Sequence, residues 1–417
     1  MSDLRLKALL KKFVAPWPPR SAVAYSGPFA QSLEILVLQP TPFCNIDCDY
    51  CYLPNRSATQ RMSLDTIRSA VGMVLDAGLV DSRLCIVWHA GEPLVLPVSY
   101  YAEAFAAVEQ TVQGKFEIAH SIQTNGMLID EAWCEFFQRQ PVRIGLSIDG
   151  PAFLHDWHRK TRQGKPTHAQ TLRGAKILRE FGIPFHVIAV ISADSLDHAE
   201  AIFRFFEELG IAELGFNVEE LEGDHASSSL EGKTAAQRIE KFWQQLYELS
   251  EASSAKVEIR EFRRAAKAIL TSQGERPWQE TAQQNDQVIP FRILSVDCHG
   301  RVSTFSPELL GIPSARYNDF TFGQVGKDDL QTIRTSDTFQ RVATEVQRGV
   351  ESCAKTCEFF TVCGGGAPSN KYFENGSFTS TTTMYCRTAI QLPIQVVLSG
   401  LERKLDLPKR SVAGATN

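Results

Sequence analysis

Three closely spaced cysteines, Cys44, Cys48 and Cys51, constrain this chain more than any other feature. Their C-x3-C-x2-C run follows an apolar segment from Leu33 to Leu38, which has the pattern of a β-strand. Thiolates this close together at the end of a strand are typical of iron–sulfur or zinc ligands. Because a closed structural metal site normally takes four protein ligands, a set of three leaves one coordination position for another molecule.

From Leu33 onward, apolar β-like runs alternate with helical patterns. A serine suited to an N-cap and glycines suited to helix ends punctuate the alternation. The predicted strands are Leu33–Pro40, Leu84–Ala90, Phe116–Thr124, Val142–Ile148, Pro184–Ser192 and Glu213–Val218. The predicted helices between them are Ser63–Ala77, Val98–Val112, Asp130–Arg139, His168–Phe181 and Leu196–Leu209.

This alternation predicts an α/β fold whose parallel strands are joined by right-handed crossovers. The economical architecture is a partial (β/α)6 TIM-like barrel with a cysteine-rich C-terminal extension. A doubly wound open sheet is the alternative, because the pattern alone does not separate the two. We divide the chain into a lead-in (1–32), the partial barrel (33–222), a helical bridge (223–290), an extension with an auxiliary metal site (291–390) and a C-terminal tail (391–417).

Composition excludes several classes of protein. A net charge of -5 with 22% charged residues provides no basic surface for nucleic acid. No apolar run reaches the roughly 18 residues that a membrane span needs, and no signal-peptide pattern is present. We therefore expect a cytoplasmic protein with neither a nucleic-acid nor a membrane partner. In a reducing compartment its 10 cysteines are ligands, catalysts or core residues rather than disulfides.

Polar or glycine-containing loops follow all six predicted strands. Since the carboxyl ends of barrel strands meet at one face, these loops should converge on one site. They are the three-cysteine loop, His89–Pro93, Thr124–Gly126, Ser147–Pro151, the segment after Ser192, and Asn217 with Glu219 and Glu220.

A second group of cysteines lies near the C-terminus: Cys353, Cys357, Cys363 and Cys386. Four thiols can close a site, so this group predicts a complete iron–sulfur cluster without an open iron. A four-cysteine zinc site is the alternative. The run Gly364–Gly366 beside it predicts a tight chain path around the cluster.

The three-cysteine spacing, together with the Gly91-Glu92-Pro93 loop after the second strand, resembles the radical S-adenosylmethionine (SAM) superfamily. The resemblance implies that Cys44, Cys48 and Cys51 hold a 4Fe-4S cluster whose fourth iron is chelated by SAM. It also implies that Gly91 and Glu92 hold the methionyl amine of SAM. The usual first glycine of that loop is Ala90 here, which is a departure from the family pattern.

The same resemblance implies further SAM-binding residues. Ser147 and Arg159 match positions used by members that modify peptides, and Tyr50 matches the position that contacts the adenine. The planar fork of an arginine suits the SAM carboxylate. We also assign Asn217, at the end of the sixth strand, to cofactor binding. The alternative for residues 159–162 is a solvated basic loop.

The second cysteine group resembles the SPASM extension of radical SAM peptide maturases, which commonly holds two auxiliary clusters. Two expected ligand positions are occupied by Phe305 and Ala367, so we predict one auxiliary 4Fe-4S cluster on the four cysteines. Cys298 is left over. Three segments, Phe216–Gly223, Phe305–Gly311 and Cys363–Phe378, closely resemble the cyclophane-forming maturases of glycine-rich-repeat precursor peptides, the GrrM/OscB group.

This last resemblance implies a reaction and its partners. A deoxyadenosyl radical from SAM removes a Cβ hydrogen of a small glycine-rich precursor peptide, and the carbon radical bonds to an aromatic ring. The auxiliary cluster then takes an electron, and Glu219 or Glu220 takes a proton. A reducing electron donor is required. The alternatives are another SPASM-type modification, making formylglycine or a thioether, and a non-catalytic iron–sulfur electron carrier.

Overall fold

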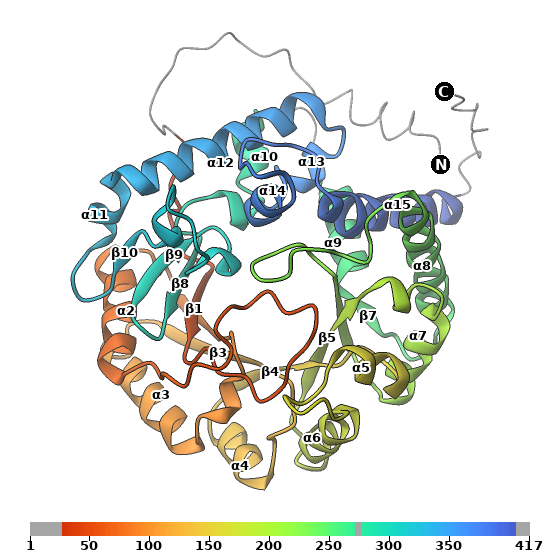
Figure 1. The fold of residues 1–417 in the computed structure, drawn as a ribbon, viewed down its shortest axis with the longest axis horizontal. Helices are drawn as coiled ribbons and strands as arrows, with labels where there is room; N and C mark the ends of the chain where they lie inside the picture. The colour runs from red at the N-terminus through yellow and green to blue at the C-terminus, as the bar shows by residue number, and fades with distance from the viewer. Residues whose placement is uncertain (1–26, 272–276, 406–417) are drawn as a thin grey trace.

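The computed structural model describes residues 27–271 and 277–405. Most of the predicted lead-in, residues 1–26, lies outside this description, and its last residues, 27–32, form no helix or strand. Six strands pair side by side in chain order, all parallel, and curve into a ring with helices on the outside (Figure 1). They are β1 (Ile35–Gln39), β2 (Arg83–Trp88), β3 (Glu117–Thr124), β4 (Val142–Ser147), β5 (Phe185–Ile191) and β6 (Glu213–Val218).

This strand order decides between the two predicted architectures. A doubly wound sheet reverses its strand order at a switch point. Here strands β1 to β6 follow one another without a reversal, so the barrel-type fold is confirmed. All six predicted strands are present, and the ends differ from the prediction by at most two residues.

The helices between the strands begin and end near the predicted residues. Ser63 caps the first of them by accepting a hydrogen bond from the Thr66 amide at 3.0 Å. Gly78, Gly182 and Gly210 follow three helices with positive φ, the conformation that stops a helix without strain in glycine. The helices are α2 (Leu64–Asp76), α3 (Val98–Val112), α4 (Glu131–Arg139), α5 (Ala152–His158), α6 (His168–Glu180) and α7 (Ala199–Glu208). Helix α5 was not predicted, because its seven residues are too short for a clear period.

The sheet does not stop at the predicted boundary of the barrel. Strand β8 (Ile293–Asp297) pairs in parallel with β1 along its whole length, and β9 (Arg301–Thr304) and β10 (Gly323–Gln324) follow antiparallel. Strand β7 (Glu258–Ile259) extends the other edge beside β6. The division at residue 291 is therefore not a boundary in the sheet, because pairing between strands more than 250 residues apart leaves no local pattern in the sequence.

Helices α8 (Lys233–Ala252) and α9 (Arg260–Thr271) form the predicted bridge. Within the predicted C-terminal tail, residues Leu392–Lys404 form helix α15, which packs on both, and residues 406–417 lie outside the described residues. Its apolar face includes Val396 and Val397, each at most 5% exposed. Burial of that face, which the sequence analysis did not recognise, keeps the segment helical.

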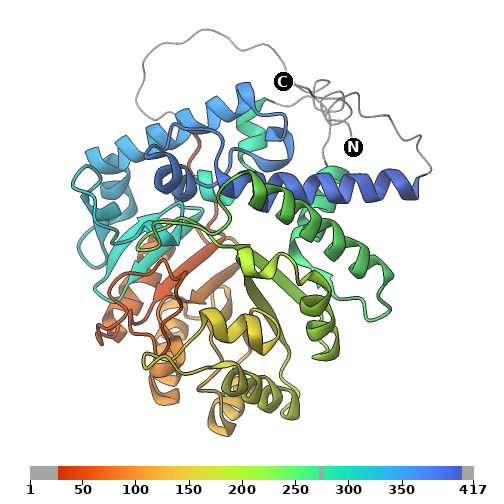
Figure 2. The ribbon, with the colours of Figure 1, turned by 45° about the vertical axis from the view of Figure 1, so that its right-hand side comes forward.

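The remaining helices build the extension, which lies over one side of the ring (Figures 1 and 2). They are α10 (Trp278–Ala282), α11 (Leu330–Thr335), α12 (Asp337–Thr356), α13 (Phe360–Cys363) and α14 (Pro368–Asn375). A π-helical turn at Cys386–Gln391 leads directly into α15. Helix α10 belongs by sequence to the predicted bridge (223–290), but it contacts α12 and α13 of the extension.

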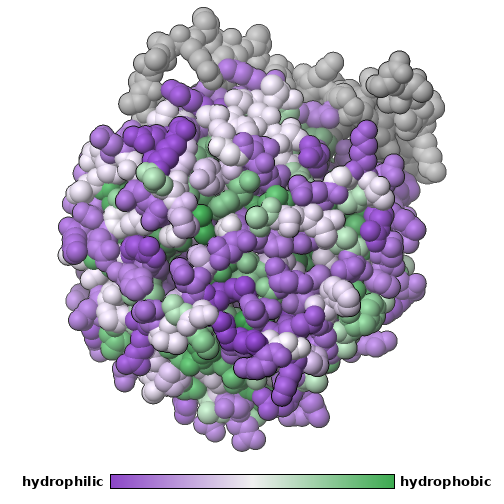
Figure 3. Space-filling model, viewed as in Figure 1, coloured by the Kyte–Doolittle hydropathy of each residue, from purple (hydrophilic) through white to green (hydrophobic). Residues whose placement is uncertain are grey.

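The two faces of the sheet differ in burial. Trp88 and His120 point outward and pack on Phe105 of α3, while Gln123, Ser147 and Val190 point inward and are only half-buried. The inward face is therefore less completely buried than the outward face. It lies toward the centre of the ring in Figure 1, where polar and apolar side chains both reach the surface in Figure 3. Within the described residues, no helix is long and apolar enough to cross a membrane.

Candidate active site at the strand ends

The three-cysteine loop leaves the carboxyl end of β1 and is fixed from several sides. The Cys51 amide donates to the Cys48 carbonyl at 3.3 Å, and the Cys44 amide donates to the Arg56 carbonyl at 3.1 Å. Burial, followed by the nearby Glu92 and Cys51, raises the pKa of the Cys44 thiol to about 12. Burial also raises the pKa of Cys48, and the other two thiols add to this rise. Burial and neighbouring thiols thus oppose the ionisation of Cys44 and Cys48, and a cationic centre such as iron would stabilise them as thiolates.

The Gly91–Glu92 loop after β2 packs directly on the chain that leads to Cys44. A Cβ at Gly91, where φ is +60°, would lie 2.5 Å from the Thr41 carbonyl oxygen and 2.6 Å from that of Phe43. Glycine is therefore required both by its conformation and by the close approach. Ala90, where the family has glycine, also has a positive φ of 74°, so the loop retains the glycine-type backbone there.

Glu92 is held rigidly at this site, with 1% of its surface exposed. Its Oε1 accepts from the Thr124 hydroxyl at 2.6 Å and the Leu94 amide at 2.9 Å, and its Oε2 accepts from the Asn125 amide at 2.7 Å. Burial raises the pKa of Glu92 to about 6 despite these hydrogen bonds. The loops after β2 and β3 are thus joined through one carboxylate, which could accept from an amine.

Arg159 is buried, with 7% of its surface exposed, so the alternative of a solvated basic loop is wrong at this residue. Its Nε and Nη2 pair with Asp149 at 2.8 and 3.0 Å, and its Nη1 lies 3.9 Å from the Cys48 sulfur. The Tyr50 hydroxyl donates to the same Asp149 carboxylate. The fork that the sequence analysis assigned to the SAM carboxylate is therefore engaged by Asp149, and only Nη1 faces the cysteine loop.

Ser147 and Asn217 lie on the inward face of the sheet. The Gln123 amide donates to the Ser147 hydroxyl at 3.0 Å, and Arg260 donates to the Asn217 side chain at 2.8 Å. The roles of Ser147 and Asn217 toward SAM stay predictions.

Glu219 and Glu220, the two candidate bases, have different surroundings. The Glu219 carboxylate accepts from the Ser229 amide at 3.0 Å and pairs with His225 at 3.0 Å, so it anchors the following loop. Glu220 accepts from the Asn370 amide at 2.7 Å. Burial and the nearby Glu308 raise the pKa of Glu220 to about 8. Glu219 is therefore held by the following loop, whereas Glu220 contacts α14, and the role of either as a base stays a prediction.

Sequence reasoning missed the group around Glu220. Burial raises the pKa of Glu222 and of Glu308, and within the described residues the Glu308 Oε2 has no hydrogen-bond partner. The three segments that resemble cyclophane-forming maturases each contribute to this group. Phe216–Gly223 contains Glu220 and Glu222, Phe305–Gly311 contains Glu308, and Cys363–Phe378 contains Asn370. Those segments therefore meet in space, and their shared occurrence was the signal that could have identified these residues.

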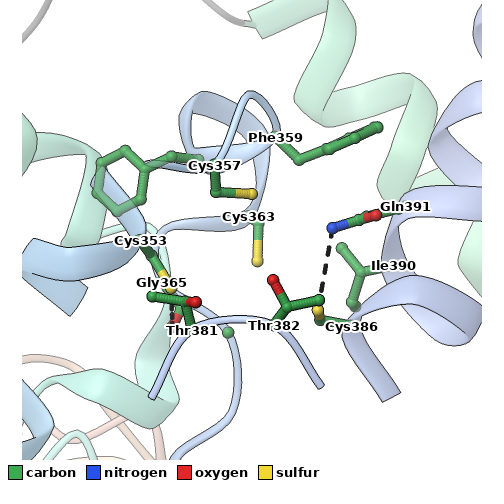
Figure 4. A pocket seen from close by; sticks show the side chains of 12 residues that line it. Cys353, Cys357, Phe359, Cys363, Gly365, Thr381, Thr382, Cys386, Ile390 and Gln391 are labelled. Carbon is green, nitrogen blue, oxygen red and sulfur yellow. Dashed lines mark hydrogen bonds between the residues drawn. The ribbon is translucent and has the colours of Figure 1, made fainter. Parts of the chain in front are cut away.

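The second cysteine group also converges. Cys353, Cys357, Cys363 and Cys386 line one pocket, and Figure 4 shows their sulfur atoms around a common hollow. Burial raises the pKa of Cys357 to about 12 and that of Cys363 to about 11, and the thiols of Cys353 and Cys386 add to both rises. Four mutually close thiols without a disulfide fit the predicted auxiliary cluster.

The chain around this pocket explains two sequence features. Gly364, Gly365 and Gly366 all have positive φ, and a Cβ at Gly365 would lie 2.9 Å from Val350, so the predicted tight path is present. Phe305 and Ala367, which replace two family ligands, are buried apolar residues. Cys298 does not line the pocket.

Within the described residues, no three ligand side chains are close enough to share a single metal ion. A cluster of four irons differs from a single ion because each of its ligands binds a different iron, which spreads the sulfur atoms apart. Three thiols at the end of β1, with a buried carboxylate on the next loop, fit the predicted iron–sulfur cluster with one open iron. The fold and this site together are those of a barrel-type protein with a cysteine site at the carboxyl ends of its strands.

Comparisons with known proteins agree. The family model for the Radical SAM superfamily matches residues 38–206. An uncharacterized protein of Synechocystis sp. is 41% identical over 379 residues, which cover 90% of this chain and 93% of the relative. A serine-type anaerobic sulfatase-maturating enzyme of Bacteroides thetaiotaomicron is 24% identical, with 83% of this chain and 85% of the relative covered.

Among solved structures, native anSMEcpe with bound AdoMet and Cp18Cys peptide has the same fold, with a TM-score of 0.70 at 20% identity. The match covers 89% of this chain and 98% of that one. This chain belongs to the radical SAM superfamily. It is an enzyme that binds SAM and a 4Fe-4S cluster, so the alternative of a non-catalytic electron carrier is not retained.

Proposed function

We propose that this protein is a maturase of a ribosomally made precursor peptide and forms a carbon–carbon crosslink between a side-chain Cβ and an aromatic ring. The observation that carries the proposal is the position of Asn370 and Lys371 on α14. The Asn370 amide lies 2.7 Å from the carboxylate of Glu220, which follows the sixth strand. The Lys371 Nζ lies 3.3 Å from the Cys353 sulfur. A candidate proton acceptor and a candidate electron-acceptor site are thus joined by two consecutive residues.

The residues at the strand ends have distinct tasks in this proposal. Cys44, Cys48 and Cys51 would hold the cluster, and Glu92 would accept from the amine of SAM. When bound together, the cluster and SAM supply a deoxyadenosyl radical that removes a hydrogen atom from the substrate. Asp149 fixes Arg159 and Tyr50 beside Cys48, so the neighbourhood of the cluster is rigid before any substrate binds.

The crosslink needs a proton acceptor and an electron acceptor. One hydrogen atom leaves the Cβ, the Cβ bonds to a ring carbon, and the ring regains its aromaticity by losing one proton and one electron. Glu220 is the residue that would take the proton. The pocket formed by Cys353, Cys357, Cys363 and Cys386 is the site that would hold an acceptor for the electron.

The test is anaerobic reconstitution with SAM, a reductant and a small glycine-rich peptide encoded beside this protein. We expect deoxyadenosine and a peptide that has lost two hydrogens, with tandem mass spectra in which fragmentation is suppressed between the joined residues. A peptide whose mass is unchanged, despite deoxyadenosine release, would contradict the proposed crosslink.

Formylglycine formation is a second candidate, favoured by the likeness to the sulfatase-maturating enzyme over most of the chain. Oxidation of a serine to formylglycine also removes two hydrogens, so mass alone does not separate the two reactions. An aldehyde reacts with a hydrazide probe, whereas a carbon–carbon crosslink does not. A product that reacts with the probe therefore identifies formylglycine, and a thioether product is recognised by a cysteine that resists alkylation.

A further inference from the structure

Lys371 is a buried lysine beside the second cysteine pocket. Only 3% of its surface is exposed, and its Nζ lies 3.3 Å from the sulfur of Cys353. Within the described part of the chain, that sulfur is the only hydrogen-bond partner of its ammonium group. A buried lysine normally requires a carboxylate partner, so a thiolate ligand in this role is unusual.

The packing around Lys371 holds the ammonium group in place. Lys371 comes from α14, while Cys353 lies in the last turn of α12. A Cβ at Gly349 would lie 3.2 Å from the Lys371 Nζ, and a Cβ at Gly366 would lie 3.5 Å from its Cε. The side chain therefore passes between two glycines; a Cβ at Gly349 would crowd the ammonium group, whereas one at Gly366 would make an ordinary contact.

The first cysteine site has a cation in a comparable place but with a different charge balance. Arg159 approaches the Cys48 sulfur at 3.9 Å, and its charge is neutralised by the bidentate pair with Asp149. No such carboxylate accompanies Lys371 among the described residues. Hydrogen bonds and net charge near the ligand sulfurs set the reduction potential of an iron–sulfur cluster, and a buried positive charge favours the reduced form.

We propose that Lys371 raises the reduction potential of the auxiliary cluster, which is held by Cys353, Cys357, Cys363 and Cys386. The auxiliary cluster, rather than the cluster at the strand ends, then accepts the electron. This inference rests on the auxiliary cluster of the proposed function. Lys371 acts as a positioning and tuning residue through Cys353 and does not touch the substrate.

The test uses full-length protein in which Cys44, Cys48 and Cys51 are replaced by alanine, so that only the auxiliary cluster assembles. Midpoint potentials are measured by redox titration followed by electron paramagnetic resonance. Lys371→Met removes the charge at similar length, and Lys371→Gln retains a hydrogen-bond donor without the charge. We expect both variants to lower the reduction equilibrium constant by about tenfold, which is about 59 mV for a one-electron couple.

Two controls fix the interpretation. Lys371→Arg keeps the charge and should keep the potential near that of the parent. Lys355→Met removes an exposed lysine from the same last turn of α12, where water screens the charge, and should also leave the potential unchanged.

The outcomes separate the two proposals. An unchanged potential in Lys371→Met or Lys371→Gln overturns the role of Lys371 while leaving the auxiliary cluster intact. If the protein with the three alanines binds no cluster, although circular dichroism shows that it is folded, the auxiliary site itself is overturned.

Discussion

At the scale of single residues, Glu219 and Glu220 show how neighbours in a sequence can have unrelated roles. Side chains alternate in direction at the end of a strand, so one carboxylate reaches the loop that contains Ser229 and the other reaches Asn370 on α14. Their types and positions made both candidates for the same task. Only their partners separate them.

The first prediction concerns this pair. Glu220→Gln should reduce crosslinking by about 100-fold, the lower range for loss of a general base, while leaving deoxyadenosine formation in place. Glu219→Gln should keep the rate and instead lower the free energy of unfolding by about 1–3 kcal/mol, because a buried hydrogen-bonded charge is lost. Product analysis by mass spectrometry and urea unfolding measure the two effects. Equal rates in both variants would remove Glu220 from the mechanism.

The second prediction follows from the raised pKa of Glu220, about 8. A base must be deprotonated to accept a proton, so the crosslinking rate should rise with pH as Glu220 ionises near that value. This rise of the rate with pH should be absent from the residual activity of Glu220→Gln and should persist in Glu219→Gln. The rate of crosslinking in single turnover against pH is the measurement. If the rate of Glu220→Gln still rises with pH near 8, the ionisation belongs to another group.

At the scale of elements, the loops after the strands depend on close backbone contacts. The Gly91 loop packs on the carbonyls of Thr41 and Phe43, and a Cβ at Gly223 would lie 2.1 Å from the Tyr52 carbonyl oxygen. Both contacts flank the three-cysteine loop, one on each side. The loops after β2 and β6 therefore support the loop after β1 from both directions.

The third prediction tests this support. Gly91→Ala combines a positive φ with a contact at 2.5 Å between the added Cβ and the Thr41 carbonyl oxygen. It should lower the free energy of unfolding by about 1–3 kcal/mol and reduce the iron bound at the three-cysteine site. Gly114→Ala is the matched control, because φ there is +70° but no atom lies within 4 Å of the added Cβ. Iron content after anaerobic reconstitution should fall only in Gly91→Ala. Equal iron in the two variants would show that the contact is dispensable.

The fourth prediction concerns the packing of α15. A Cβ at Gly400 would lie 2.3 Å from the Tyr247 hydroxyl oxygen of α8, so Gly400→Ala should destabilise the protein by about 1–3 kcal/mol through overpacking. Gly72→Ala in α2, where nothing lies within 4 Å, should instead stabilise it by about 0.5–1 kcal/mol. Urea unfolding measures both. A stabilising Gly400→Ala would mean that α15 is free to move away from α8.

At the scale of the whole molecule, the sheet joins parts of the chain that the sequence separates. β1 carries the first cysteine loop at its end and is paired on one side with β2 and on the other with β8. The extension that holds the second cysteine group therefore shares a sheet with the barrel. The two cluster sites are parts of one folded unit.

The fifth prediction follows from this shared sheet. Urea unfolding of the full chain should be a single transition, with tryptophan fluorescence and far-ultraviolet circular dichroism coinciding. Truncation after residue 290 should not leave a folded barrel, because it exposes the edge of β1 and the apolar faces of α8 and α9. Two separate transitions in the full chain would contradict this coupling.

The sequence by itself determined the β/α units of the barrel and both cysteine sets. Strand and helix periods, caps and ligand spacing are local properties that neighbouring residues express. The tertiary structure alone decided that Asp149 engages Arg159, that β8 lies beside β1, and that Lys371 reaches Cys353. Each of these depends on where distant segments meet, since the contact forms only after the chain has folded and leaves no periodic pattern along it.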